Sequence, residues 1–139
     1  MDVSNNTALT YRYCNTNQLA SMDVSNYTAL TYLYCFSNQL TSLDVGSNTA
    51  LTYLSCTVNQ LTSLDISANT LLEQLFCARN QLTSLNVANG NNTNFIRLYA
   101  NSNPNLTCIQ VDDVAYSEAN WTGSFFIFDP QTSFSEDCN

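Results

Sequence analysis

LTYLYCFSNQL, residues 30–40, recurs as LTYLSCTVNQL at 51–61 and, with more changes, as LLEQLFCARNQL at 71–82. The Leu, Cys and Asn positions are constant in the three copies, whereas the residues between them change. The repeat has a period of 21 residues, and Cys therefore stands at 14, 35, 56 and 77. A fifth copy starts at Leu85 and a sixth begins as LTCIQV at 106–111. Repeats of this length form stacked coils, because one repeat cannot bury its own apolar face, so we expect a solenoid.

The residues within one copy alternate with period two. In YLYCF, residues 32–36, Leu33 and Cys35 point to one side and the three aromatic residues to the other, which predicts a short parallel strand in every coil. A second alternation follows at 43–45, with Leu43 and Val45 inward. Too few residues remain between the two strands for a helix of ordinary length. The sequence therefore predicts a β-rich solenoid with little or no helix.

The constant residues fit the leucine-rich repeat signature, Leu-x-x-Leu-x-Leu-x-x-Asn-x-Leu, with Cys35 in the third Leu place. The repeat length and the inward Cys resemble the internalin-type and related short repeats of secreted bacterial proteins. The match covers residues 1–111, as five repeats of 21–23 residues and a partial sixth, and residues 112–139 resemble the C-terminal cap of such arrays. The resemblance implies a right-handed superhelix with a parallel sheet on its concave face, secreted or at the cell surface, used for binding.

The composition argues against several functions. Three Arg, no Lys and eleven acids give the 139-residue chain a formal net charge of -8, which would repel a phosphate backbone, so nucleic acid is not an expected partner. No apolar run is long enough to span a membrane, and we expect no membrane insertion. The N-terminus lacks the basic and apolar regions of a signal peptide, so a signal for export would have been removed or would lie outside this chain.

Catalysis is not expected either. His and Lys are absent, and no acid on the varying positions stands near a nucleophile. The regularly spaced Cys lack a Cys-x-x-Cys pair, so we interpret them as small apolar core residues and not as metal ligands. The sequence implies no cofactor and no metal.

Two polar positions recur along the array. The Asn of each repeat can bridge backbone groups of neighbouring turns through its amide; these residues are Asn17, Asn38, Asn59, Asn80 and Asn103. A column of Asp would place like charges about 5 Å apart, and we expect it to be satisfied by neighbouring serines or turn amides, because Ca²⁺ needs more oxygen ligands than such a loop offers. The column consists of Asp2, Asp23, Asp44 and Asp65.

The tail contains two Cys outside the period. Cys108 and Cys138 both lie in the cap region, and in an exported protein we expect them to form a disulfide that joins the tail to the last coil. The tail is also rich in aromatic residues, which we expect to cover the open end of the core. These are Trp121, Phe125, Phe126, Phe128 and Phe134.

The outward positions of the first strand change from coil to coil but hold six Tyr and two Phe. Tyr offers a large contact area with few rotors and a polar tip, as recognition surfaces require. We predict that this surface binds a protein or a glycan. The predicted ligand-binding residues are Tyr11, Tyr13, Tyr32, Tyr34, Phe36, Tyr53, Thr57, Gln74, Phe76, Arg79, Arg97 and Tyr99.

Three other interpretations of the outward residues stay open. The aromatic residues could merely support the sheet by cross-strand pairing. The array could be a structural spacer or adhesin stalk whose face is passive. Thr columns could form a flat array that faces ice or sugar, although Thr is also a common strand residue; they are Thr10, Thr31 and Thr52, and Thr41, Thr62 and Thr83.

The first coil is the least regular. Arg12 takes the inward place of Leu33, Met1 takes the place of Leu43, and no cap precedes the coil. An uncovered edge offers unpaired strand groups. Either the chain is a piece of a longer array or the first coil serves as its own imperfect edge, and in the isolated fragment we expect two chains to associate as a homodimer through their N-terminal edges.

Overall fold

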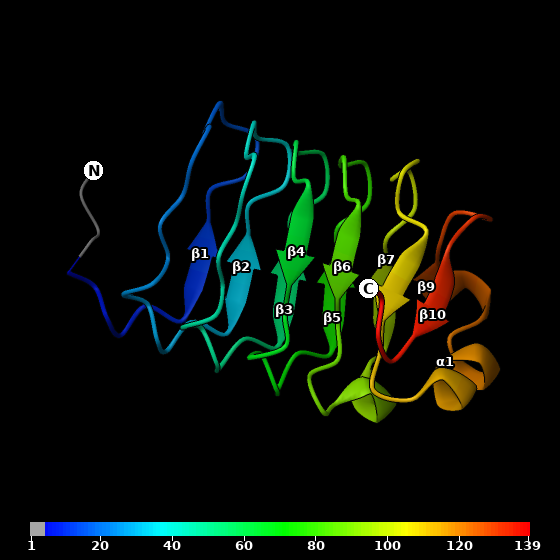
Figure 1. The fold of residues 1–139 in the computed structure, drawn as a ribbon. Coiled ribbons are helices and arrows are strands. Elements are labelled where there is room, and N and C mark those ends of the chain that lie inside the picture. Colours follow the sequence, from blue (N-terminus) through cyan, green and yellow to red (C-terminus); the bar gives the residue numbers. More distant parts are fainter. Residues whose placement is uncertain (1–4) are drawn as a thin grey trace.

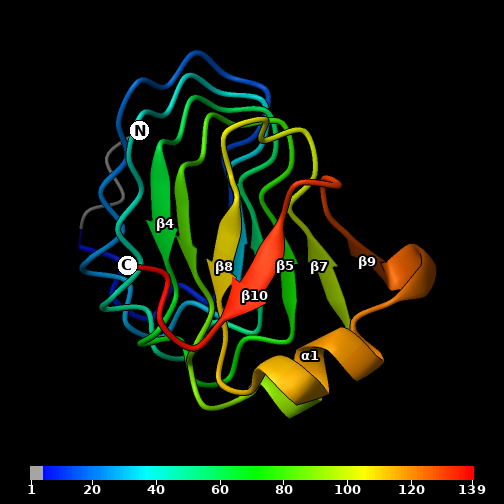
Figure 2. The same cartoon turned by 45° about the vertical axis from the view of Figure 1, so that its right-hand side comes forward.

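Two parallel sheets lie on opposite sides of a stack of coils in the computed structural model, which describes residues 5–139 (Figures 1 and 2). Sheet A has six strands, in the order β1 (Tyr11–Tyr13), β2 (Tyr32–Tyr34), β3 (Tyr53–Ser55), β5 (Gln74–Phe76), β7 (Arg97–Tyr99) and β9 (Phe126–Ile127). Sheet B has four, in the order β4 (Ser63–Asp65), β6 (Ser84–Asn86), β8 (Cys108–Gln110) and β10 (Ser133–Ser135). The fold is therefore a β-rich solenoid, as the repeat predicts.

Helix is scarce, as expected. The described residues contain one short α-helix, α1 (Val114–Asn120), and two single turns of 3-10 helix, η1 (Asn92–Asn94) and η2 (Gly123–Phe125). Asp113 caps α1 by accepting a hydrogen bond from the Tyr116 amide at 2.9 Å. The helix lies at the far end of the solenoid from β1 (Figure 1).

The core is built from columns of identical side chains. Strand pairing places Leu33, Leu54, Leu75 and Leu98 in register, and all four are fully buried. Cys35, Cys56 and Cys77 form a second fully buried column beside them. Burial of one Leu side chain contributes about 1.5–3 kcal/mol, so the repeated positions supply the main stabilisation of each coil.

The second strand of each coil forms only in the later coils. Sheet B begins at Ser63, and the equivalent segments at 21–23 and 42–44 are not strands. Leu43 and Val45 are nevertheless buried, as the alternation predicts. In the early coils this side of the chain is therefore held against its neighbours by apolar contact and side-chain hydrogen bonds, and not by a strand ladder.

The repeated Asn bridges neighbouring coils, as predicted. Asn59 Nδ2 donates to the carbonyl oxygens of Cys35 and Cys56 at 3.1 and 3.0 Å, and its Oδ1 accepts from the Leu40 amide at 3.0 Å. Asn38, Asn80 and Asn103 make the equivalent set. Each side chain thus satisfies three buried backbone groups, which would be costly to leave unpaired.

A second Asn ladder was not predicted. Asn69 Nδ2 donates to the carbonyl oxygens of Val45 and Asn48, and Asn48 Nδ2 donates to those of Val24 and Tyr27, all at 2.9 Å. Both amides are fully buried. This ladder joins the coils near their other corner, where the first ladder does not reach.

The Asp column is satisfied by turn amides. Asp44 and Asp65 accept hydrogen bonds from the amides of Gly46 and Ser67 at 2.8 Å. Asp23 accepts from both the amide and the hydroxyl of Ser25, which lowers the pKa of its carboxyl group. Asp2 and Met1 lie outside the described residues.

The tail continues the solenoid. Its strand β9 pairs with β7 in sheet A, and β10 pairs with β8 in sheet B. Trp121 is buried with its ring 5.6–5.7 Å from those of Phe95, Phe126 and Phe134, and covers the end of the core. The expectation for Phe125 was wrong: its side chain is 53% exposed, because the register that turns Phe126 inward beside Leu98 turns Phe125 outward.

The two Cys of the tail form the expected disulfide. Cys108 at the start of β8 is bonded to Cys138, with 5.8 Å between their Cα atoms. The bond joins the last segment of the chain to sheet B. The four Cys of the repeats, Cys14, Cys35, Cys56 and Cys77, are free thiols.

Candidate functional site

The outward side chains of sheet A form a continuous stack of aromatic rings. We call this stack the aromatic ladder, and it consists of Tyr11, Tyr13, Tyr32, Tyr34, Tyr53, Phe76 and Tyr99. The strands pair in register, so equivalent residues lie beside one another at about the 4.8 Å spacing of strands, which is also a favourable spacing for stacked rings. The backbone repeat itself therefore sets the ladder.

Two rows of rings merge in the middle of the ladder. Tyr11 stacks on Tyr32 with 4.7 Å between ring centroids, and Tyr13 stacks on Tyr34 at 4.5 Å. Tyr53 lies 4.6 Å from Tyr34 and 5.8 Å from Tyr32, because the next residue of Tyr34's row is the small Ser55.

Beyond Tyr53 the ladder is a single row. Phe76 lies 5.2 Å from Tyr53, and Tyr99 meets Phe76 edge to face at 5.0 Å. The Tyr99 hydroxyl donates to the Ser124 carbonyl at 3.0 Å, so the last ring is fixed by the tail.

Stacking decides which part of each ring reaches solvent. The inner rings are half-buried, since their faces cover one another, and they expose edges and hydroxyl groups. Tyr11 and Tyr13 at the end of the ladder are 51% and 65% exposed, because no ring covers their outer faces. The ladder thus offers polar edges along its length and open ring faces at one end.

Two hydroxyl groups in the middle of the ladder have raised pKa values. Burial, together with the neighbouring Tyr53 and Tyr13, raises the pKa of Tyr34 to about 12. Burial also raises the pKa of Tyr53. These hydroxyl groups are therefore neutral donors and acceptors for a partner.

Not all predicted ligand-binding residues belong to the ladder. Gln74 is in register with Tyr53 and Arg97 on the outer side of sheet A. Arg97 lies with its guanidinium 5.4 Å from the centre of the Phe125 ring. Phe36 and Thr57 follow the strands, are half-buried and make none of the ring stacks among residues 5–139.

Arg79 lies at a corner of the coil and not on the strand. Its φ is 54°, and the equivalent residues Thr16, Ser37, Val58 and Ser102 have φ between 55° and 59°. This left-handed region favours Gly or Asn, yet no coil has either residue there. The corner is therefore held by contacts between coils, such as the hydrogen bond that the Arg79 amide donates to the Asn101 carbonyl at 3.0 Å, and the Arg79 side chain is exposed at the rim of sheet A.

Sequence reasoning missed three residues at the far end of this face. Ile96 and Phe125 are 52% and 53% exposed and, with Arg97, line a hollow of about 350 Å³. Ile127 lies beside Tyr99 in the adjoining strand. FFIF at 125–128 is apolar throughout, so the sequence has no alternation that separates the outward Phe125 from the aromatic residues that cover the core.

Sheet B presents a different surface. Its outward residues are small and polar, and include Ser63, Asp65, Ser84, Asn86, Gln110, Ser133 and Ser135. A hollow of about 230 Å³ is lined by Ser42, Asp44 and their equivalents in the next coil, but the carboxylates there already accept turn amides.

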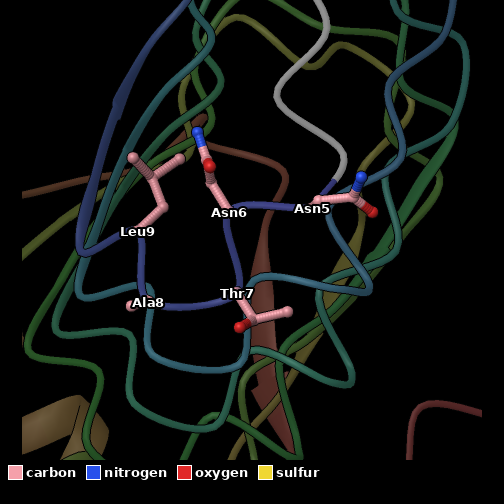
Figure 3. Close-up of a pocket in the computed structure, with 5 residues that line it drawn as sticks. All are labelled: Asn5, Asn6, Thr7, Ala8 and Leu9. Carbon is pink, nitrogen blue, oxygen red and sulfur yellow. The ribbon is translucent and has the colours of Figure 1, made fainter.

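A third hollow, of about 380 Å³, lies at residues 5–9 in the first coil (Figure 3). The side chains of Asn5, Asn6 and Thr7 point in different directions and do not converge on one point. This arrangement does not resemble a ligand site.

The Thr columns take part in bonding between coils. Thr31 Oγ1 donates to the Thr10 carbonyl at 2.9 Å, and Thr52 and Thr83 make longer equivalents at 3.3 Å. These hydroxyl hydrogens are thus committed to the backbone. This favours a structural role for the columns over an ice- or sugar-facing array.

The buried thiols are unsuited to nucleophilic chemistry. Burial raises the pKa of Cys35, Cys56 and Cys77, that of Cys77 to about 12, so the thiols are protonated at neutral pH. Within residues 5–139, no three His, Cys, Asp or Glu side chains gather closely enough to hold a metal ion. Over the same residues, no helix has the length and apolar character needed to cross a membrane.

Comparisons with known proteins relate this chain to one solved fold. The functional domain of InlJ from Listeria monocytogenes, which includes a cysteine ladder, is similar in structure, with a TM-score of 0.50 and 22% sequence identity over 96% of this chain. The chain spans about a third of that solved chain, 35% of its length. At this identity the similarity shows a leucine-rich-repeat-like fold and no more. No family model matches the sequence, and no curated protein matches it.

Proposed function

We propose that the protein is a non-catalytic recognition module that binds a protein partner across the aromatic ladder of sheet A. The observation that carries the proposal is the ladder itself, a run of seven half-buried or exposed rings across five neighbouring strands. Tyr-rich surfaces of this kind are typical of recognition sites, because the ring gives contact area at low entropic cost and the hydroxyl gives hydrogen bonds.

A comparison with sheet B indicates that the outward rings of sheet A serve recognition and are not needed to stabilise the sheet. Sheet B has the same parallel, in-register pairing, but its outward residues are Ser, Asp, Asn, Gln and the disulfide-bonded Cys108. Parallel pairing in this solenoid therefore does not need outward aromatic residues. A spacer with a passive face would have no reason to concentrate rings on one side only.

The stacking favours a protein over a glycan. A sugar ring binds best with its C–H groups on an open aromatic face, and the inner rings of the ladder have their faces covered by one another. Edges and neutral hydroxyls suit main-chain amides and small side chains of a protein. Arg97 and Arg79 add positive charge near the far end of the same face, so a partner with acidic residues there fits best.

We propose that the module acts outside the cell, either secreted or at a cell surface. The Cys108–Cys138 disulfide supports this location, because disulfides persist in oxidising compartments. The buried free thiols are compatible with it, since burial protects them from oxidation.

The class of partner is tested by screening the fluorescently labelled protein on arrays of extracellular proteins and of glycans. A ladder variant, Tyr34→Ser, Tyr53→Ser and Phe76→Ser, is screened in parallel, after circular dichroism has verified its fold. We expect protein hits that the ladder variant loses and no glycan hit that depends on the three rings. Hits bound equally by both proteins, or ring-dependent glycan hits alone, would contradict the proposal.

A further inference from the structure

Two large apolar side chains are exposed around one hollow on the outer face of sheet A. Ile96 precedes β7 and Phe125 precedes β9, and with Arg97 they line a hollow of about 350 Å³. Both apolar side chains are more than half exposed. The volume lies at the small end of the range for ligand pockets, so the hollow suits one side chain of a partner and not a drug-sized molecule.

Ile96 departs from the repeat at this place. Its amide donates to the Glu73 carbonyl, just as the Thr52 amide donates to the Thr31 carbonyl, so Ile96 stands in the column of Thr residues. The hydroxyl groups of that column bond the preceding coil, whereas Ile has no hydroxyl and its side chain is exposed. Neither the core nor the bonding between coils therefore accounts for an apolar residue here.

Phe125 is carried by a segment that is fixed on both sides. The Tyr99 hydroxyl donates to the carbonyl of Ser124 at 3.0 Å, and the ring of Phe126 stacks on Trp121 with 5.7 Å between centroids. The backbone that presents the Phe125 ring is therefore held before a partner arrives. A wall that is already in place loses little conformational entropy on binding.

The charged group at the hollow is Arg97. Its guanidinium lies 5.4 Å from the centre of the Phe125 ring, in cation–π contact. Within residues 5–139, its side chain makes no ion pair with a carboxylate. A guanidinium on a ring face keeps N–H groups at its edge, where a carboxylate can accept two of them. The hollow thus combines apolar walls with a place for one carboxylate.

The charge of the chain limits how much acid a partner can bring. The formal net charge is -8, and Glu73 lies beside Ile96 in the preceding coil. A segment with several acids is repelled by this field, whereas one carboxylate placed against Arg97 is attracted. The complementary segment therefore carries a single acidic residue.

The spacing between the acidic and the apolar residue follows from the geometry of an extended segment. Immediate neighbours in such a segment point to opposite sides, and residues two apart lie on the same side, about 7 Å from each other. The guanidinium and the Phe125 ring are 5.4 Å apart, which is close to this distance. A side chain against the ring and a carboxylate against the guanidinium are therefore two residues apart in the partner.

We propose that the hollow is the anchor site for the partner of sheet A, and that it takes an extended segment with a large apolar residue and an acidic residue two positions away. The apolar side chain packs between Ile96 and Phe125, and the carboxylate accepts N–H bonds from Arg97. Large buried side chains next to an Arg are typical of the few contacts that dominate an interface. This inference rests on the proposal that a protein lies across the aromatic ladder, and it names the residues that hold that protein at one end.

The test uses two end-capped peptides that carry the same residues in opposite order, Gly-Thr-Phe-Thr-Glu-Thr-Gly and Gly-Thr-Glu-Thr-Phe-Thr-Gly. Each is titrated into the full-length ¹⁵N-labelled chain, and the amide shifts of Ile96 and Phe125 report binding. We expect one order to bind at least about threefold more tightly than the same peptide with Gln in place of Glu. The peptide with Ala in place of Phe should not bind at millimolar concentration.

Four variants locate the contacts. Ile96→Thr, which restores the residue of the Thr column, and Phe125→Ser should each weaken binding of the Glu and Gln peptides alike. Arg97→Gln should bind the two peptides equally, because it lacks the charge that distinguishes them. Phe76→Ser, which changes the ladder and leaves the hollow intact, should bind the Glu peptide within about twofold of wild type, since distant sites act independently. Circular dichroism verifies the fold of each variant.

A second measurement separates this inference from the proposed function. Proteins selected on the arrays should bind Ile96→Thr and Arg97→Gln at least about tenfold more weakly than wild type. If they depend on the three rings of the ladder variant but bind both hollow variants as well as wild type, the anchor is wrong and the proposed function stands. If the peptides bind as expected and no protein on the arrays does, the proposed function fails and the chemistry of the hollow stands.

Three results with the peptides would overturn the inference. They are the absence of shifts at Ile96 and Phe125 at millimolar peptide, equal binding of the Glu and Gln peptides by wild type, and a preference for Glu that Arg97→Gln retains. Self-association in sedimentation that Phe125→Ser abolishes would show that a second copy of the chain occupies the hollow, which would also overturn it.

Discussion

Sheets A and B are built from the same coils and differ in what they show to solvent. Inward, both carry buried Leu in register, such as Leu54 in sheet A and Leu64 in sheet B. Outward, sheet A carries stacked rings and sheet B carries small polar residues. Because one backbone arrangement tolerates both surfaces, the stacking of coils dictates only the inward half of each strand, and the outward half is free to serve another purpose.

The strands of the two sheets also end differently. Sheet A strands lead into a corner with positive φ, whereas the sheet B side ends in turns where an Asp or Asn side chain accepts the amide two residues on. Sheet B therefore satisfies its turns with matched side chains. Sheet A holds its corners by backbone hydrogen bonds between coils, such as that from the Val58 amide to the Ala78 carbonyl, at some local strain.

Replacement of an inward Leu should cause the largest loss of stability, and the loss should be similar in the two sheets. Leu54→Ala and Leu64→Ala each remove a buried side chain and leave a cavity, so we expect each to lower the free energy of unfolding by about 2–5 kcal/mol. Urea unfolding followed by circular dichroism measures this loss. A loss under 1 kcal/mol in only one sheet would show that the two inward halves are not equivalent.

Reduction of the disulfide should destabilise sheet B more than sheet A. The loop between Cys108 and Cys138 spans 30 residues, so loss of the bond should cost roughly 3–4 kcal/mol through the entropy of the unfolded chain. We expect faster hydrogen exchange in β10 than in β9, because Cys138 follows β10 and the disulfide ties that segment to β8, whereas β9 pairs with β7 of sheet A. Mass spectrometry with and without a reductant tests this, with Cys108→Ser and Cys138→Ser as the control; equal exchange in both strands would contradict it.

Alkaline pH should weaken sheet A through Tyr34. Its pKa is raised to about 12 in the folded state, above the ordinary value for Tyr of about 10, so the folded state holds this proton more tightly than the unfolded state. The stabilisation is fully present below about pH 10 and is lost as pH rises through about 12. The urea midpoint should therefore fall less between pH 9 and pH 11 in Tyr34→Phe than in wild type, and identical falls in both proteins would contradict the raised pKa of Tyr34.

We expect the smallest change in stability from a substitution at the corner that follows β3. Val58 has φ of 56°, which is unfavourable for a β-branched residue and acceptable for Asn. Val58→Asn should therefore raise the free energy of unfolding by about 0.5–1 kcal/mol. Thr57→Asn, one residue earlier and without positive φ, is the matched control and should give no gain. A stabilisation of both variants alike would mean that strain at Val58 is not the cause.

The sequence was sufficient for the parts of the fold that repeat. The constant Leu, Cys and Asn predicted the solenoid, the inward columns and the first Asn ladder, because each coil must stack on the next in the same way. The second ladder of Asn48 and Asn69 has only two regular members and was missed. Residues 42–44 have the same alternation as β4 but are not a strand, so the local pattern does not distinguish the two segments.

The sequence predicted which residues face outward but not which of their side chains contact one another. Alternation identified which residues of β1, β2 and β3 face outward, but the merging of two rows at Tyr53 depends on the space above Ser55. Phe125, the last residue of η2, is exposed although we expect the tail aromatics to cover the core, because the irregular tail has no repeat that indicates which way this side chain points. In both cases the deciding factor is contact with a neighbouring strand, and not the residue itself.

The central claim is that sheet A binds a protein and sheet B does not. It is tested most directly by titration calorimetry with a protein ligand selected on the wild-type chain, against the ladder variant and a sheet B variant, Ser63→Ala, Ser84→Ala and Ser133→Ala. If three rings are central contacts, the ladder variant should bind at least about 100-fold more weakly, while the sheet B variant binds within about twofold of wild type. Unchanged affinity in the folded ladder variant, or an equal loss in both variants, would contradict the account.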